Sequence, residues 1–357
     1  MPKFMLSGGG TGGHIFPALA IAEELRARYP GCELHFVGAL GRMEMEKIPA
    51  AGYTITGLPI RGLQRSFSLQ NLRLPFDLIR SLRMAFSLLQ SFKPDCVIGT
   101  GGYASGALLF AAAWKGIPTL IWEGNGYAGL TNRWLGKKVD IVCTGFEGME
   151  AFFPADKIRN TGNPVRKDIL SLPPRSNGLR HFGLEERPVC LVIGGSLGAG
   201  SLNHALSAGV DQLLNAGIQV IWQTGKRFDT APFQHKKGLW CGAFIPEMHL
   251  AYAAADLIVS RAGALSVSEI AVAGKPAILV PSPNVTADHQ TANARKLSDV
   301  GAALLLPDAQ TDQLIPTIQR EMANAEGLQR MQEKLRSLAK PGAGSAIANE
   351  ITQLIQA

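Results

Sequence analysis

The sequence predicts an α/β protein with two doubly wound parallel sheets, and three observations support this fold class. Short apolar runs alternate with longer helical stretches, as in proteins whose parallel strands are joined by crossover helices. The order of apolar run, glycine-rich turn, helix and second apolar run occurs twice, from Lys3 and from Val189. The length of 357 residues and the 46% hydrophobic content suit two domains that each bury a core.

The first half contains a series of expected strand–helix units. The turn SGGGTGGHIFP at residues 7–17 joins a strand to a helix, and Pro17 fits the first helical turn, where a missing N–H is tolerated. The strand that follows is ELHFVGALG, at residues 33–41. Residues 95–122 and 139–145 continue the alternation, so this half is expected to form one parallel sheet.

The second half repeats this organisation, with further strands and helices in residues 255–281 and 301–307. We therefore expect two Rossmann-like domains that face a cleft, residues 1–162 and residues 179–342. Residues 163–178 contain several Pro and Ser residues and a Gly, and they are expected to link the two domains.

Two further features are expected to be buried. The last segment, residues 343–357, is an amphipathic helix with Ile347, Ile351 and Leu354 on one side, and we expect it to cross back to the first domain. The five cysteines show no C-x-x-C spacing and lie mostly in strand-like runs, so we expect them to be small buried hydrophobes.

The net charge is +7, and much of the basic surplus lies in residues 61–93, which hold six basic residues and one acid. On a helix, Leu78, Leu82 and Leu89 would share one face. The arginines off that face are Arg73, Arg80 and Arg83. This pattern is typical either of an amphipathic core helix with a solvated basic side or of a patch for an anionic membrane surface. Nucleic acid is not favoured as a partner, because no nucleic-acid motif accompanies the charge.

The first glycine-rich turn formally matches the G-x-G-x-x-G dinucleotide fingerprint at Gly8, Gly10 and Gly13. Such a turn lets backbone N–H groups and a helix N-terminus face an anion. A dinucleotide site also needs an acid at the end of the second strand, but residues 38–40 are Gly, Ala and Leu. A Walker A site is excluded because no G-K-[ST] follows either loop. The turn therefore binds another phosphate or is only a tight packing turn.

The second half offers more groups for a nucleotide. The stretch GGSLGAGSLN forms another anion cradle, in which Ser196 adds a hydroxyl. Residues 264–268 are expected at a helix N-terminus, with Glu269 in the first turns. This carboxylate either complements the helix dipole or accepts hydrogen bonds from two ribose hydroxyls. The sequence DHQTANA places polar side chains, among them Gln290, at another helix start.

Taken together, these motifs resemble those of the MurG family, the family 28 glycosyltransferases of the GT-B class that act in peptidoglycan synthesis. The likeness covers nearly the whole chain, through GGGTGGHIFPALA, GTGGYASG, EGNGYAGLTNRWL, TGNPVR, GGSLGAGSLN, SRAGALSVSEIAVAGKPAILVP and DHQTANA in the same order. The chain departs from the family pattern at four positions. Trp122, Gly124, Leu197 and Ala107 stand where His, Gln, Gln and Pro are usual.

The resemblance implies a metal-independent, inverting hexosyltransferase without a cofactor. It would transfer GlcNAc from UDP-GlcNAc to the 4-hydroxyl of the muramoyl sugar of undecaprenyl-pyrophosphoryl-MurNAc-pentapeptide (lipid I), giving lipid II. The absence of any D-x-D sequence agrees with this. The first domain would bind the acceptor and the second UDP-GlcNAc.

The resemblance also implies a peripheral protein at the cytoplasmic face of the bacterial inner membrane. Residues 61–93 would meet the anionic membrane surface. The reaction belongs to cell-wall biogenesis and so to cell shape and division. Proteins of cell-wall synthesis and cell division are the partners that this role suggests.

Substrate contacts follow from the same resemblance. Thr11, Gly12 and Gly13 would cradle a pyrophosphate, whereas Asn125 and Gln290 would contact GlcNAc. Without the resemblance, these two amides would be assigned to helix capping or to hydrogen bonds within loops. The residues similar to nucleotide, phosphate and sugar contacts are Arg166, Ser196, Ile245, Ala264, Leu265, Ser266, Val267, Ser268 and Glu269.

An inverting transfer is a single displacement, so it needs one base for the acceptor hydroxyl and no enzyme nucleophile. His14 stands where the glycine loop meets the helix, and a neutral imidazole suits proton abstraction near pH 7. Glu123 is a rival candidate for the base. His14 could instead cap the helix or hydrogen-bond a bound pyrophosphate.

Two other functions remain open at the level of sequence. The first is another GT-B sugar-nucleotide enzyme, such as a UDP-GlcNAc 2-epimerase, which would be indifferent to lipid. The second is a nucleotide-sugar-binding module without catalysis, which would bind UDP-GlcNAc and show no turnover with a polyprenyl acceptor.

Overall fold

The computed structural model describes residues 1–60, 74–195, 198–285 and 288–356. The chain divides into two compact units, of which the first is Met1–Pro164 with Gly342–Ala357 and the second is Val165–Pro341. Each unit contains one parallel sheet with helices on both faces, which confirms the predicted α/β class. The segment from residue 165 to residue 178, which we had assigned to the linker, lies in the second unit.

The first unit contains a seven-stranded sheet in the order β3-β2-β1-β4-β5-β6-β7, and neighbouring strands are parallel throughout. The strands are β1 (Lys3–Gly8), β2 (Glu33–Ala39), β3 (Thr54–Leu58), β4 (Cys96–Gly101), β5 (Thr119–Glu123), β6 (Ile141–Thr144) and β7 (Ile158–Arg159). The strand order reverses between β1 and β4. The turns that follow these two strands therefore start side by side at the carboxyl edge of the sheet and lead to helices on opposite faces. In sheets of this kind, ligands bind at the carboxyl ends of the strands beside such a switch point.

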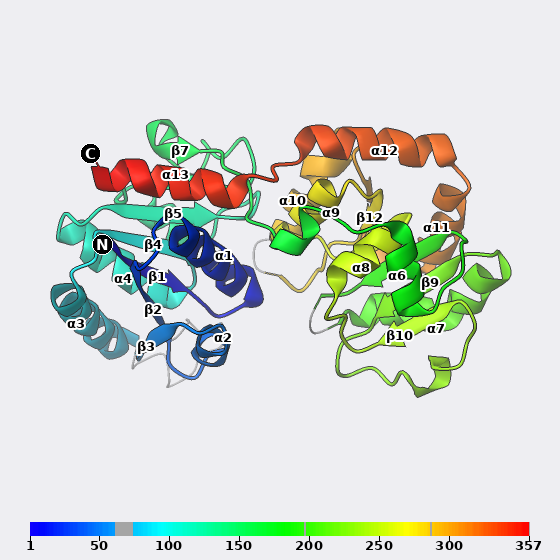
Figure 1. The fold of residues 1–357 in the computed structure, drawn as a ribbon, viewed down its shortest axis with the longest axis horizontal. Coiled ribbons are helices and arrows are strands. Elements are labelled where there is room, and N and C mark those ends of the chain that lie inside the picture. The colour runs from blue at the N-terminus through cyan, green and yellow to red at the C-terminus, as the bar shows by residue number, and fades with distance from the viewer. Residues whose placement is uncertain (61–73, 196–197, 286–287, 357) are drawn as a thin grey trace. The chain divides into compact units, whose positions relative to one another are not determined.

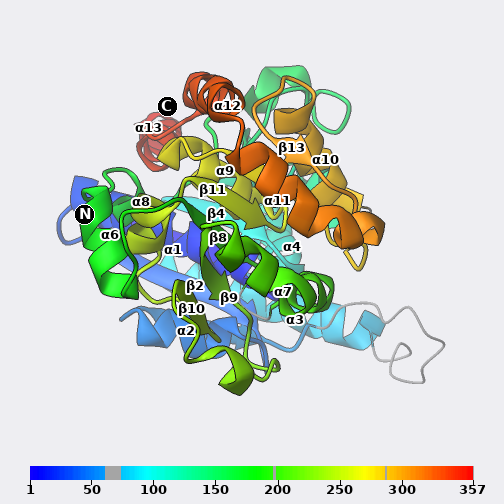
Figure 2. The same cartoon turned by 90° about the vertical axis from the view of Figure 1, so that its right-hand side faces the viewer.

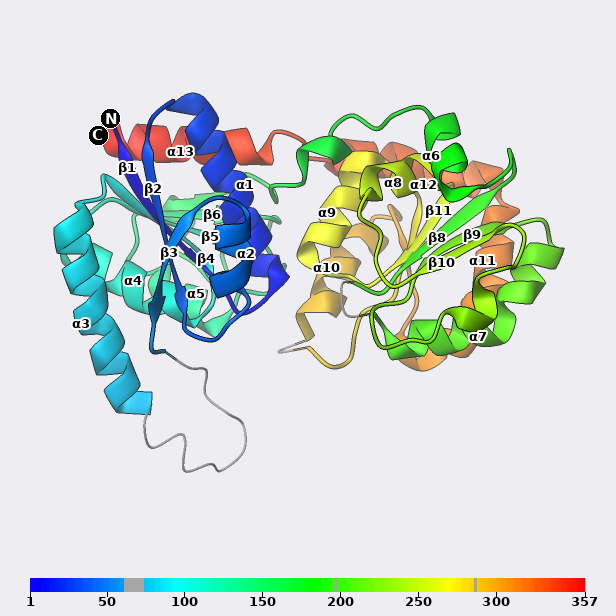
Figure 3. The same cartoon turned by 60° about the horizontal axis from the view of Figure 1, so that its bottom comes forward.

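Helices cover both faces of this sheet (Figure 3). One face carries α1 (Gly12–Arg28), α2 (Glu44–Ala50) and α13 (Ala343–Gln356), and the other carries α3 (Leu74–Phe92), α4 (Tyr103–Trp114) and α5 (Leu130–Leu135). The C-terminal helix α13 packs along α1 (Figure 1), and Thr352 Oγ1 accepts a 2.9 Å hydrogen bond from the Tyr29 hydroxyl. Ile347 and Ile351 of α13 are fully buried, whereas Leu354 is only partly buried.

The start of α1 differs from our expectation. The sequence predicts Pro17 in the first helical turn, but the helix begins five residues earlier, at Gly12, after an extended Thr11. Pro17 is therefore inside the helix, where it leaves the carbonyl of Gly13 without an intrahelical donor. As a result, Gly12, Gly13 and His14 form the first turn, and their N–H groups lie at the end of the helix that attracts anions.

Only part of the predicted apolar face of α3 is buried. Leu89 is buried, but Leu78 is 46% exposed, because the buried positions of the helix begin only at Ser81. The first turns of α3 instead expose Phe76 (75%) and Ile79 (51%) together with Leu78. The basic side chains of this exposed part are Arg80 and Arg83. Arg73 and the other residues of 61–73 lie outside the described residues.

The second unit contains a parallel six-stranded sheet in the order β10-β9-β8-β11-β12-β13. Its strands are β8 (Val189–Ile193), β9 (Gln219–Gln223), β10 (Leu239–Gly242), β11 (Leu257–Ser260), β12 (Ala277–Leu279) and β13 (Leu304–Leu305). Its helices are α6 (Arg175–Phe182), α7 (Gly200–Asn215), α8 (Met248–Ala254), α9 (Ala264–Ala273), α10 (His289–Ser298), α11 (Leu314–Met322) and α12 (Ala325–Leu338). In Figure 2, α6 and α8 lie on one side of the strands and α7 and α11 on the other.

Two further findings concern cysteines and membrane spans. All five thiols are free, and those other than Cys32 are buried. Within the described ranges, no helix combines the length and the hydropathy needed to cross a bilayer.

Candidate functional site

In the first unit, the glycine turns after β1 and β4 are in direct contact. The N–H of Gly9 donates a 3.2 Å hydrogen bond to the carbonyl of Gly101. Gly102 has a φ of +93°, and a Cβ at this position would lie 2.6 Å from the carbonyl oxygen of Gly9. Only glycine fits such a position, so the glycines of GTGG allow the two turns to touch. The N-termini of α1 and α4 are therefore adjacent, an arrangement that suits an anion.

His14 lies at this contact, in the first turn of α1. Its Nδ1 is 2.9 Å from the carbonyl oxygen of Gly9, and its own carbonyl accepts a 2.7 Å hydrogen bond from Thr100 Oγ1. Because a carbonyl oxygen only accepts, Nδ1 must carry the hydrogen. In the neutral ring, this tautomer leaves a lone pair on Nε2. The half-buried His14 thus has a ring nitrogen, Nε2, that can accept a proton.

Thr11, Gly12 and Gly13 lie on the same turn as His14. The carbonyl of Thr11 accepts the N–H groups of His14 at 3.1 Å and of Ile15 at 3.2 Å. The N–H groups of Gly12 and Gly13 belong to the first turn of the helix, which has no preceding carbonyls to bond. The structure therefore brings four of the predicted residues together at one helix N-terminus.

Glu123, the rival candidate for the base, is only 4% exposed and accepts four hydrogen bonds. Its Oε1 bonds the backbone N–H and the side-chain amide of Asn125, at 3.0 and 3.1 Å. Its Oε2 bonds the N–H of Gly129 and the amide of Asn132, both at 3.0 Å. The carboxylate thus holds the loop between β5 and α5. Both carboxylate oxygens are therefore occupied in this structure, and they fix Asn125 at the carboxyl end of β5.

In the second unit, Glu269 of α9 forms a two-pronged ion pair with Arg166. Arg166 Nε lies 2.8 Å from Glu269 Oε1, and Nη2 lies 3.0 Å from Oε2. The hydroxyl of Tyr252 donates to the same Oε2 at 3.3 Å. Burial, with the nearby Glu269 carboxylate, raises the pKa of Tyr252 well above its usual value, so the hydroxyl stays protonated and donates. Two residues predicted to contact the donor therefore hold each other in place.

The other predicted donor residues follow strands β10, β11 and β12 of the second sheet. Residues 264–269 open α9 directly after β11, as expected. Ile245 follows β10, and its side chain is buried while its N–H donates to Gln223 Oε1 at 2.9 Å. Gln290, on the first turn of α10, accepts the N–H of Ser282 at 2.8 Å. All lie beyond the carboxyl ends of strands, where parallel sheets bind ligands. Ser196 and Leu197 lie outside the described residues.

Sequence reasoning missed Arg261, which follows β11 and ties this edge together. Its Nη1 donates to Asp308 Oδ1 at 2.6 Å and to the carbonyl of Val280 at 3.1 Å. Its Nη2 donates to Ser201 Oγ, in the first turn of α7, at 2.7 Å. Arg261 belongs to the motif SRAGA, but its hydrogen-bond partners lie in three distant segments of the chain. No local sequence pattern predicts that these segments meet at Arg261.

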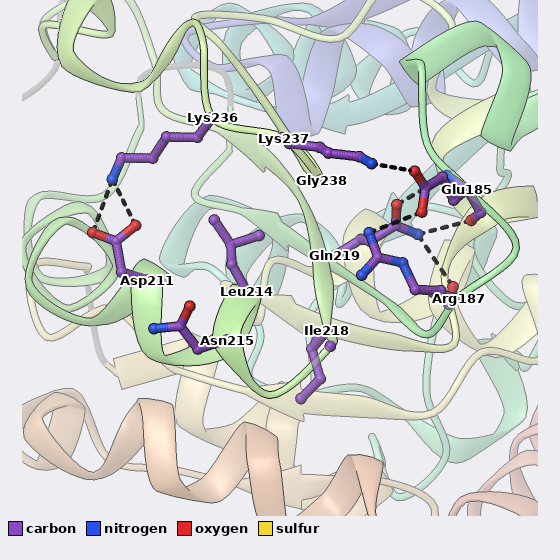
Figure 4. Close-up of a pocket in the computed structure, with 11 residues that line it drawn as sticks. Glu185, Arg187, Asp211, Leu214, Asn215, Ile218, Gln219, Lys236, Lys237 and Gly238 are labelled. Atoms are coloured by element: carbon purple, nitrogen blue, oxygen red, sulfur yellow. Dashed lines mark hydrogen bonds and ion pairs between the residues drawn. The ribbon is translucent and has the colours of Figure 1, made fainter.

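A cavity of about 620 Å³ in the second unit holds none of the predicted residues (Figure 4). Its lining includes the segments that precede β8, β9 and β10, at the opposite edge from α9 and Arg261. Its charges are paired, with Lys236 Nζ 2.6 Å from Asp211 and Lys237 Nζ 2.9 Å from Glu185. We therefore do not assign the donor to this cavity. Nowhere in the described part of the chain do three His, Cys, Asp or Glu side chains gather as metal ligands would.

Comparisons with known proteins give one consistent result. Residues 4–144 match the description Glycosyltransferase family 28 N-terminal domain, and residues 189–347 match Glycosyltransferase family 28 C-terminal domain. The chain is 47% identical to a protein of Flavobacterium psychrophilum, over 99% of this chain and 98% of that one. It is 49% identical to a protein of Porphyromonas gingivalis, over 99% and 96%. Both are named UDP-N-acetylglucosamine–N-acetylmuramyl-(pentapeptide) pyrophosphoryl-undecaprenol N-acetylglucosamine transferase.

Solved structures share the fold. A crystal structure of MurG from Acinetobacter baumannii has a TM-score of 0.81 and 32% identity, over 99% of this chain and 100% of that one. A UDP-GlcNAc 2-epimerase from Neisseria meningitidis has a TM-score of 0.67 and 16% identity, over 99% and 100%. At this lower identity, the likeness to the epimerase concerns the fold alone.

Two of the departures from the family pattern contact each other. The indole ring of Trp122, which is buried, lies over Gly124, and a Cβ on Gly124 would be 2.3 Å from its Cη2. Trp122 Nε1 also donates to the carbonyl of Gly162 at 3.4 Å. The glycine at 124 therefore makes room for the indole at 122, so the two departures form one packing unit beside Glu123.

We expect Gly124→Ala to lower the free energy of unfolding by about 1–3 kcal/mol, because the buried indole must move. Trp122→His should relieve this cost in the double variant, which makes the two effects non-additive. Gly129→Ala is the matched control, since its Cβ would meet nothing closer than 3.8 Å. Denaturant unfolding measures all four variants. Equal losses at positions 124 and 129, or strict additivity, would contradict the packing unit.

Proposed function

The chain belongs to glycosyltransferase family 28, and from this membership we propose its reaction. It transfers GlcNAc from UDP-GlcNAc to the 4-hydroxyl of the muramoyl sugar of lipid I, with inversion, and releases lipid II and UDP. The observation that carries the proposal is the identity of 47–49% along 99% of the chain with transferases of that name. The site geometry agrees with it.

On the acceptor side, we assign His14 Nε2 as the base. It removes the proton of the 4-hydroxyl while that oxygen attacks the anomeric carbon of GlcNAc from the face opposite UDP. The bond from the anomeric carbon to the UDP oxygen breaks in the same step, so the configuration inverts and no covalent enzyme intermediate forms. The N–H groups of Gly12 and Gly13, next to Thr11, hold a diphosphate at the start of α1.

On the donor side, we assign Glu269 to the ribose hydroxyls and Arg166 to the diphosphate. These side chains now pair with each other, so UDP replaces part of that ion pair with its own hydroxyls and phosphates. The start of α9 adds N–H groups that stabilise the negative charge on the leaving UDP. Asn125 and Gln290 contact GlcNAc. The remaining donor contacts are assigned to Ser196, Ile245, Ala264, Leu265, Ser266, Val267 and Ser268.

We assign the beginning of α3 to the membrane surface. Its exposed apolar side chains, Phe76, Leu78 and Ile79, are followed directly by the exposed cations Arg80 and Arg83. Interfacial binding needs both components, since apolar side chains enter the headgroup region and cations attract anionic lipids. The polyprenyl tail of the acceptor stays in the bilayer, so an enzyme that works on it must reach the membrane surface, here the cytoplasmic face of the inner membrane.

The first test is transfer of radiolabelled GlcNAc to a short-chain lipid I analogue. The wild type should form the labelled disaccharide lipid. An epimerase would convert UDP-GlcNAc without the lipid, and a binding module would convert neither UDP-GlcNAc nor the lipid. His14→Ala should lower kcat by about 10²–10⁴-fold, because a general base is lost. Its affinity for UDP should stay unchanged.

Glu123→Gln is the comparison for His14→Ala, and circular dichroism checks that both variants are folded. If His14→Ala keeps nearly the wild-type kcat at saturating substrates, His14 is not the base. If Glu123→Gln, folded and with normal UDP affinity, then caused the larger loss, Glu123 would be the base.

The second test concerns Glu269. A hydrogen bond to a charged group contributes about 1.5–3 kcal/mol, so Glu269→Ala should weaken UDP binding by roughly 10- to 150-fold. Acceptor KM should change little. Calorimetry with UDP measures the effect, with Glu333→Ala, at an exposed position of α12, as the control. Tight binding of NAD to the wild type without binding of UDP would end the donor assignment.

The third test concerns membrane attachment. Reversing the charges of Arg73, Arg80 and Arg83 to Glu should release the protein from anionic vesicles, since each surface cation contributes about 1 kcal/mol. Flotation with vesicles measures attachment, which in the wild type should weaken as salt rises.

The control for that test carries the same change of net charge on the second unit, at the exposed residues Lys237, Arg330 and Lys334. It should float like the wild type. If the α3 variant floats equally well, this segment is only a core helix with a solvated basic side.

A further inference from the structure

Glu44 is a buried acid that the reaction above does not use. It is the first residue of α2, its side chain is 1% exposed, and both of its oxygens accept backbone hydrogen bonds. Oε2 accepts the N–H of Gly10 at 2.8 Å, and Oε1 accepts the N–H of Ala39 at 3.0 Å. Among the described side chains, none forms an ion pair with it. Its charge is stabilised by these two N–H groups.

The glycine turn is shaped around this carboxylate. A Cβ on Gly9 would lie 2.1 Å from Glu44 Oε1, and a Cβ on Gly38 would lie 2.6 Å from Glu44 Cγ. Gly10, which donates to the carboxylate, has a φ of +84° that favours glycine. Three glycines at the carboxyl ends of β1 and β2 are thus accounted for by one buried side chain.

The same peptide group joins Glu44 to His14. The N–H of Gly10 and the carbonyl of Gly9 belong to one peptide unit. Its N–H donates to Glu44, and its carbonyl accepts from His14 Nδ1 at 2.9 Å. A carboxylate, a peptide group and an imidazole therefore form one continuous chain of hydrogen bonds.

We propose that Glu44 is a positioning residue for His14 and acts through the Gly9–Gly10 peptide. Hydrogen bonds in series polarise one another, so the carboxylate makes the carbonyl of Gly9 a stronger acceptor. A stronger acceptor holds the hydrogen on Nδ1, keeps the lone pair on Nε2 and stabilises the positive ring once it has taken the proton. A carboxylate bonded directly to a histidine acts in this way, and here one peptide group stands between them.

This inference rests on the proposed role of His14 as the base, and a double-mutant cycle tests it. Glu44→Gln should lower kcat by roughly 10- to 100-fold, the range found when the hydrogen-bond partner of a metal-binding histidine is removed. The KM for UDP-GlcNAc should stay within about twofold, because the residues assigned to the UDP part of the donor lie on the second unit. In a His14→Ala background, Glu44→Gln should have almost no further effect on kcat.

Glu46→Gln is the matched control, since it removes the same charge from an exposed position of the same helix. It should leave kcat unchanged. Effects of Glu44→Gln that add to those of His14→Ala, or that equal those of Glu46→Gln, would overturn the proposal.

Nitrogen-15 NMR of histidine-labelled protein gives a readout independent of activity. The signals of His14 are identified by their loss in His14→Ala. In the wild type and in Glu46→Gln, Nδ1 should carry the hydrogen, whereas Glu44→Gln should show a mixture of both tautomers. An unchanged tautomer in Glu44→Gln would overturn the proposal. If His14→Ala keeps its activity, the base assignment fails, and the spectra still decide whether Glu44 fixes the ring.

Circular dichroism and UDP affinity show whether Glu44→Gln is folded. If it is not, Glu44→Asp replaces it in both measurements, because Asp keeps the charge and withdraws the carboxylate by one methylene. Glu44→Asp should then show the mixed tautomer and the lowered kcat, and a wild-type spectrum for this variant would overturn the proposal.

Discussion

The functional edge of the first unit depends on one steric constraint, the direct contact between the backbone turns that follow β1 and β4. Gly102 can carry no side chain there, since a Cβ would lie 2.6 Å from the carbonyl oxygen of Gly9. The contact sets the N-termini of α1 and α4 side by side and confines the ring of His14 between Gly9 and Gly101. The capacity of this edge for anions therefore follows from how the turns pack, because N–H groups at the start of a helix have no partner within it.

The second unit holds its functional edge together with side chains. Arg261 joins the start of α7, the end of β12 and the segment that holds Asp308. Arg166 and Glu269 form an ion pair that Tyr252 supports from its buried position. Paired charges of this kind keep their places without a ligand and can exchange partners when one binds. On the proposed donor assignment, a nucleotide would meet groups that are already oriented, which reduces the ordering cost of binding.

The periodic features of the sequence predicted the sheets, the two series of units and the helix starts at 264 and 289, because they depend on local alternation and turn residues. Features that depend on distant partners were missed. Spacing predicts one face for Leu78, Leu82 and Leu89 but not how much of it is covered, and the buried positions of α3 begin only at Ser81. The preference of proline for the first turn of a helix predicts a start near Pro17, whereas the helix begins at Gly12, after an extended Thr11. The hydrogen bonds that occupy Glu123 could not be read from the sequence, and the choice between Glu123 and His14 as the base stays a prediction.

Glu44 also explains why the glycine turn matches the dinucleotide fingerprint in sequence but does not have the structure of a dinucleotide site. In a dinucleotide site, an acid at the end of the second strand holds the ribose, and the glycine turn offers its N–H groups to the pyrophosphate. Here β2 ends without an acid. The next acid is Glu44, five residues after Ala39, and its carboxylate accepts the N–H groups of Gly10 and Ala39. A dinucleotide would lose one donor of the turn and would find no carboxylate for its ribose. The turn can still offer the N–H groups of Gly12 and Gly13 to a diphosphate, while Gly9 and Gly10 connect Glu44 to His14.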